Sequence, residues 1–104
     1  MKVEITFRTV KYGMFKGSVD CVFLNDFDWG YKLTCYTRIG QHSSGCMDYF
    51  YESTRPAKHE EYESLLKELK GIYNDCELVV KNKMPSINTI VERYQKWRNE
   101  LDND

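Results

Sequence analysis

The strongest constraint on the fold is a run of alternating apolar and polar side chains near the start of the chain. Over residues 2–10, Val3, Ile5 and Phe7 fall on one side of an extended backbone, and the polar residues between them fall on the other. Successive side chains of a β-strand point to opposite faces, so this period of two predicts a strand with one buried face. The rest of the chain must then supply further strands and a cover for that face.

Two more strands are predicted to follow the first one in an antiparallel meander. The glycines at positions 13 and 17 indicate a turn, and residues 18–25 and 31–39 have strand-forming compositions. Residues 26–30 contain two aspartates and a glycine, which suit the connection of a hairpin. The three strands would form the body of one sheet.

The apolar pattern of that hairpin also predicts its register. If Asn25 faces Tyr31, then Cys21 faces Cys35 across the two strands, and one apolar face results. A shift of one residue would turn this face to solvent, so the pattern favours a single pairing. The predicted face consists of Val19, Cys21, Phe23, Leu33 and Cys35.

The middle of the chain is predicted to contain a loop and then a fourth strand. Residues 40–46 are rich in glycine and serine, as is typical of loops. Residues 47–53 would form the strand, with Tyr49 and Tyr51 on one side and Phe50 on the other. Pro56 then marks the approach to a helix, because the residue before a proline avoids helical geometry.

The second half of the chain changes to a helical period. Residues 58–70 carry apolar side chains three and four apart, residues 76–80 read as a short strand, and Ser86 can cap a final helix. The predicted fold class is α+β, a single domain over residues 1–104. An antiparallel meander of three to four strands is followed by a helix, a short strand and a C-terminal helix, with both helices on one face of the sheet.

Composition excludes several classes of protein. Hydrophobic residues make up 41% of the chain, which is too high for a disordered segment. Fifteen basic and sixteen acidic residues leave a formal charge of −1, so any nucleic-acid contact would need a local basic patch. The chain shows no signal-peptide core, no apolar run of about 20 residues and no close cysteine pairs. We therefore expect a cytoplasmic protein without membrane contact.

Cysteine and histidine side chains raise the question of a metal. Cys21, Cys35, His42 and Cys46 are ligand types that zinc accepts in a tetrahedral site. Their spacing matches no standard zinc module, however, and Cys21 and Cys35 fit the role of small core side chains. The sequence therefore predicts no metal and no other cofactor.

A small thiol enzyme is one alternative for the function. His42 and Cys46 lie four residues apart in the predicted loop, and a nearby imidazole is the usual means of generating a thiolate. Asp48 or Glu52 would orient the imidazole. No established signature of cysteine hydrolases surrounds the thiol, so no catalytic residue is assigned.

Nucleic-acid binding is the second alternative. Arg8, Lys11, Tyr12 and Lys16 gather basic and aromatic side chains around the first hairpin, with Phe15, Tyr36 and Arg38 nearby. Single strands are bound by such mixtures, because bases stack on rings while cations follow the phosphates. No RNA-binding signature is present, and most of the acidic residues follow position 25.

Binding of a protein partner is the function that the sequence favours. Eight tyrosines, two tryptophans and five phenylalanines exceed what one modest core requires, and aromatic and arginine side chains anchor protein interfaces. Arg55 would either pair with a partner's anion or tie the following helix to a local acid. The sequence leaves self-association into a homodimer open. The predicted contact residues are His42, Cys46, Tyr49, Tyr51 and Arg55.

One segment resembles a known set of proteins. The chain carries Gly40-Gln41-His42, Cys46, Thr54-Arg55-Pro56-Ala57 and Glu61-Tyr62 followed by Leu65. This run is similar to a Gly-x-His…Cys…Arg-Pro-Ala…Glu-Tyr-x-x-Leu pattern in small, uncharacterised proteins of bacterial phages and mobile elements. The likeness covers residues 40–73. It implies a bacterial or phage cytoplasm and an accessory or host-interaction role, and it carries no chemistry with it.

Overall fold

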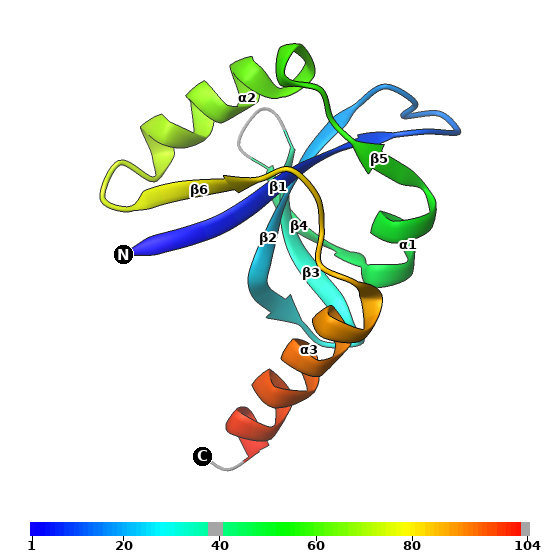
Figure 1. Cartoon of the computed structure of the whole chain (residues 1–104), viewed down its shortest axis with the longest axis vertical. Coiled ribbons are helices and arrows are strands. Elements are labelled where there is room, and N and C mark those ends of the chain that lie inside the picture. Colours follow the sequence, from blue (N-terminus) through cyan, green and yellow to red (C-terminus); the bar gives the residue numbers. More distant parts are fainter. Residues whose placement is uncertain (38–40, 103–104) are drawn as a thin grey trace.

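The computed structural model describes residues 1–37 and 41–102, and it shows an α+β fold built on one curled sheet (Figure 1). An antiparallel meander leads into a short helix, a longer helix, a short strand and a C-terminal helix, which confirms the predicted fold class. The elements are β1 (Lys2–Val10), β2 (Val19–Asp28), β3 (Lys32–Thr37), β4 (Gln41–Cys46), α1 (Met47–Glu52), β5 (Thr54–Pro56), α2 (His59–Ile72), β6 (Glu77–Lys81) and α3 (Ile87–Asp102).

The sheet has the strand order β4-β3-β2-β1-β5, and β6 also pairs with β1. Strand β6 runs parallel to the first half of β1, from Lys2 to Thr6, and β5 runs antiparallel to the last three residues, Arg8 to Val10. Because β1 has neighbours along both edges, its residues 5–10 are buried without interruption. The predicted strand is confirmed, but its polar residues Thr6, Arg8 and Thr9 are buried as well.

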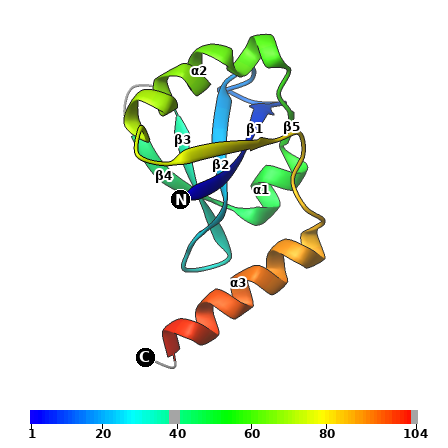
Figure 2. The same cartoon turned by 60° about the vertical axis from the view of Figure 1, so that its left-hand side comes forward.

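Apolar side chains cover both faces of the sheet rather than one. Cys21 and Phe23 of β2 pack in one cluster with Leu65 of α2, whereas Val22 and Leu24 pack in a second cluster with residues of α1 and α3. Figure 2 shows α2 and α3 on opposite sides of the strands. The expectation that both helices share a face is therefore wrong. Each helix has one apolar stripe, and the two faces of β2 each need a cover.

Strand β2 extends three residues beyond its predicted end, to Asp28, and its pairing with β3 is irregular. Phe27 pairs with Leu33 and Val22 pairs with Cys35, with a bulge between these two pairs, so the predicted register is wrong. The turn lies at residues 29–31, where Gly30 and Tyr31 both have positive φ, 84° and 57°. A bulge inserts an extra residue and changes which side chains share a face. Cys21 and Cys35 consequently belong to opposite clusters.

The segment between β3 and β5 differs most from the prediction. Residues 41–46, expected as a loop, form the edge strand β4, and residues 47–52, expected as a strand, form helix α1. Met47 and Phe50, three residues apart, are the buried residues of this helix. A Cβ atom at Gly45 would lie 2.8 Å from the ring of Phe50. Glycine at this position therefore lets α1 fold back onto the sheet with Phe50 in the core.

Across residues 1–37 and 41–102, no helix combines the length and the apolar character that crossing a bilayer requires.

Candidate functional site

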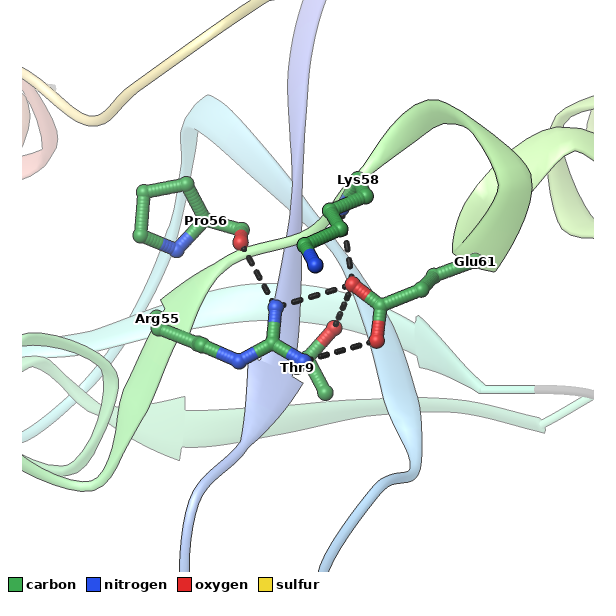
Figure 3. Close-up of polar contacts among 5 residues, drawn as sticks. All are labelled: Thr9, Arg55, Pro56, Lys58 and Glu61. Atoms are coloured by element: carbon green, nitrogen blue, oxygen red, sulfur yellow. Dashed lines mark hydrogen bonds and ion pairs between the residues drawn. The ribbon is translucent and has the colours of Figure 1, made fainter.

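Arg55 forms an internal ion pair and does not extend freely from the surface (Figure 3). Its Nη1 and Nη2 atoms donate to Oε1 and Oε2 of Glu61 at 2.8 and 2.7 Å, in a forked arrangement. The backbone N–H of Lys58 donates to the same Oε1 at 2.8 Å, and the Thr9 hydroxyl donates to it at 3.4 Å. Of the two roles predicted for Arg55, the tie between the helix start and a local acid is the one that the structure shows.

These contacts favour the ionised form of Glu61. The Arg55 guanidinium, followed by the Lys58 N–H, lowers the pKa of Glu61 to about 2. A carboxyl group whose pKa is lower in the folded state than in the unfolded state stabilises the fold. This stabilisation is complete above the pKa of the unfolded state and is lost as the pH falls through the pKa of the folded state. The contribution is therefore complete at neutral pH and disappears between about pH 4.5 and pH 2.

Replacing Glu61 by glutamine is expected to lower the free energy of unfolding at neutral pH by about 0.5–1 kcal/mol, because the pair is partly exposed and screened. Urea denaturation would measure this, and the difference from wild type should vanish at about pH 2. Glu63→Gln, an exposed acid on the same helix, is the control and should change little. Equal effects of the two substitutions would contradict a specific role for Glu61.

Arg8 is a structural residue. Its side chain is buried, and its Nε and Nη2 atoms donate to the hydroxyl and the carbonyl oxygen of Thr54 at 3.0 and 2.9 Å. Nη2 also donates to the carbonyl oxygen of Phe50 at 3.3 Å. Burial lowers the pKa of Arg8 from its ordinary value. Arg8 therefore cannot contact nucleic acid as predicted, since it fastens α1 and β5 to the sheet.

The other residues of the nucleic-acid prediction divide between the surface and the core. Tyr36 is buried and donates its hydroxyl to Glu68 at 2.6 Å, so no base can stack on it. Lys11, Tyr12 and Lys16 lie in the turn between β1 and β2, with the Lys11 ammonium 5.2 Å from the centre of the Tyr12 ring. Arg38 lies outside the described residues.

His42 and Cys46 lie near opposite ends of β4. Four residues of strand separate them by roughly 13 Å, so the imidazole does not reach the thiol. His42 Nε2 is instead 2.7 Å from the hydroxyl oxygen of Tyr73, and its ring packs edge-on against Tyr36. The expectation that the two side chains approach each other in a loop is therefore wrong. Among the described residues, no group of three or more His, Cys, Asp or Glu side chains could hold a metal ion.

Tyr49 and Tyr51 differ in their surroundings. Tyr51 is half-buried against the α3 side of the core, and its hydroxyl donates to the carbonyl oxygen of Pro85. Tyr49 is exposed on α1 and lines an open cleft at the end of the sheet. Of the five predicted contact residues, Tyr49 alone lies in this cleft.

The cleft, called the Asp20 cleft below, has a volume of about 430 Å³. This volume is within the range of small-ligand pockets. Its walls come from the ends of β1, β2 and β3, from the turn between β1 and β2, and from α1. Its lining includes Val10, Phe15, Val19, Asp20, Thr37 and Tyr49.

Asp20 is the unusual residue of this cleft. Its side chain is only 7% exposed, and within residues 1–37 and 41–102 it makes no hydrogen bond or ion pair. Burial raises its pKa to about 6. No role was predicted for Asp20 from the sequence, although an acidic residue among the apolar residues Val19, Cys21, Val22 and Phe23 is unusual for a strand. Such a group, placed in a cleft, is a candidate for function.

An apolar turn closed by backbone hydrogen bonds borders the Asp20 cleft. Glycines at positions 13 and 17 have φ values of 84° and 91°, and Gly17 N–H donates to the Val10 carbonyl oxygen at 2.9 Å. The turn presents Tyr12, Met14 and Phe15 to solvent, with Met14 91% and Phe15 68% exposed. Because Phe15 belongs to both the turn and the cleft, the two form one continuous surface.

No protein-family model matches the chain, and neither the search of curated proteins nor that of solved structures finds a match. The geometry of this surface is therefore the main guide to function.

Proposed function

We propose that this chain is a binding module that engages a protein partner through the apolar turn and the Asp20 cleft. The observation that carries the proposal is the exposure of Tyr12, Met14 and Phe15 together on one hydrogen-bonded turn. Exposed apolar side chains grouped in a patch mark interaction sites far more often than isolated ones do. A turn held by backbone hydrogen bonds also loses less entropy on binding than an unstructured segment, which favours its use as a contact surface.

The shape of the surface favours a protein over a small metabolite. The Asp20 cleft is open, and the apolar turn lies at its border. Tyr49 on one wall and Phe15 on another offer aromatic rings of the kind that anchor interfaces. The resemblance over residues 40–73 adds a proposed setting, the cytoplasm of a bacterium or its phage, and an accessory role there.

A peptide selection tests this proposal. Peptides selected from a random displayed library against the whole chain should bind the wild type and lose at least tenfold in affinity toward the double variant Met14→Ser/Phe15→Ser. The matched control is Leu101→Ser, which removes an apolar side chain of 42% exposure from the C-terminal end of α3, outside the lining of the cleft, and should change nothing. Circular dichroism checks that each variant is folded.

Three outcomes would overturn the proposed function. The selection could return no peptide whose binding depends on the turn. Sedimentation could show that the turn instead joins two copies of the chain. Single-stranded nucleic acid could bind with an affinity that falls steeply with salt and with Lys11→Gln/Lys16→Gln, which would favour the nucleic-acid alternative.

A further inference from the structure

Asp20 is a buried carboxyl group for which residues 1–37 and 41–102 provide no counterion. It faces Arg8 directly across the β1–β2 pair, yet the Arg8 guanidinium turns away to Thr54 and Phe50. The ion pairs among the described residues are Arg55–Glu61 and Lys81–Glu4, and neither includes Asp20. A buried carboxylate without a partner costs free energy, which a bound cation would recover.

The surroundings of Asp20 suit an organic cation. Phe15 and Tyr49 place aromatic rings in the cleft, and the face of such a ring attracts ammonium and guanidinium groups. Burial raises the pKa of Tyr49, so its phenol stays neutral at physiological pH. Among the described residues, the other titratable groups near Asp20 are Arg8 on β1, Cys35 on β3 and Cys21 on β2, and the described lining of the cleft contains no lysine or arginine.

We propose that the Asp20 cleft receives the cationic end of an arginine or lysine side chain of the protein partner, with Asp20 as its counterion. The proposal rests on the proposed function, because the cation is taken to belong to the partner that also contacts the apolar turn. The head group would form a charge-assisted hydrogen bond with the Asp20 carboxylate. Its alkyl stem would lie along Val10 and Val19, and Tyr49 would face its charge.

Small cations test the cleft without any partner. N-ethylguanidinium chloride and n-butylammonium chloride would be titrated into the ¹⁵N-labelled whole chain at about pH 7.5, where Asp20 is ionised. We expect saturable shifts confined to residues of the cleft, with a Kd of about 1–10 mM for at least one cation. Asp20→Asn should weaken this binding at least tenfold. N-ethylurea, a neutral analogue of the guanidinium, and sodium chloride at equal ionic strength are the controls.

The outcomes separate this inference from the proposed function. If cations bind at Asp20 and the selected peptides contain arginine or lysine and lose affinity with Asp20→Asn, both proposals are supported. If cations bind but the peptides ignore Asp20→Asn, the cleft takes a free small cation and the inference about the partner fails. If Asp20→Asn leaves cation binding unchanged, or no saturable shift occurs, the inference is overturned while the turn-dependent peptides still support the proposed function.

Discussion

Replacing Arg8 by methionine is expected to lower the free energy of unfolding by about 2–4 kcal/mol, because three charge-assisted hydrogen bonds are lost inside the protein. The guanidinium donates to carbonyl oxygens of Thr54 and Phe50, which join β5 and α1 to the sheet. Methionine fills similar space but donates nothing. Urea denaturation at neutral pH measures the change.

Lys11→Met is the control for this substitution. Lys11 follows directly after the last residue of β1, and its ammonium lies over the exposed Tyr12 ring. We expect its loss to cost less than about 0.5 kcal/mol, as is usual for surface positions. Equal stability of Arg8→Met and the wild type would mean that Arg8 is solvated, and would return it to the set of candidate nucleic-acid contacts.

Replacing Asp20 by asparagine is expected to stabilise the protein at neutral pH, which is the opposite of most substitutions in a core. The pKa of Asp20 is raised from 3.8 to about 6 by burial alone. Between these values the folded state binds more protons than the unfolded state, so stability falls as pH rises. This difference in pKa corresponds to a loss of about 2–3 kcal/mol in the free energy of unfolding. The loss is complete above about pH 6 and absent well below about pH 4.

The measurement is the difference in unfolding free energy between Asp20→Asn and wild type as a function of pH. The stability of Asp20→Asn relative to wild type should be greater by about 2 kcal/mol at about pH 7.5 than at about pH 4. Glu61→Gln is the control, because the pKa of Glu61 is lowered and its loss destabilises at neutral pH. A difference that does not change with pH would show that Asp20 is solvated or paired in solution.

Regular periodicity made three elements predictable from the sequence. Strand β1 and the two long helices carry their period over nine to sixteen residues, long enough to outweigh local irregularities. Strand β6 was also predictable, as a short apolar run between turns. The parallel pairing of β6 with β1, and the burial of both faces of the sheet, depend on contacts between distant residues and leave no local pattern.

The segment from β4 to α1 could not be predicted for a related reason. Serine and glycine have little preference for strands, and β4 exists because its backbone pairs with β3 over six residues. The aromatic side chains of α1 favour a strand, but the short distance from Gly45 to Phe50 shows that packing selects the helix. Here tertiary contacts override local preference.

The candidate site was only partly visible in the sequence. Tyr12, Lys11 and Lys16 were identified by composition, and Tyr49 by its place among aromatic residues. Asp20 was missed because an acid in a strand usually faces solvent, and only the fold shows that Asp20 is buried in a cleft it shares with Thr37 of β3 and Tyr49 of α1. Four of the predicted contact residues are close in sequence but lie in different parts of the fold, away from the cleft: His42, Cys46, Tyr51 and Arg55.

The most direct single measurement is the pKa of Asp20, determined by NMR from the chemical shift of its side-chain carboxyl carbon in the whole chain. We predict a pKa of about 6 in the free protein. Adding N-ethylguanidinium should lower that pKa, because a bound cation favours the ionised carboxylate. A pKa near 3.8 that does not respond to the cation would contradict the interpretation of Asp20 as an unpaired, buried recognition group.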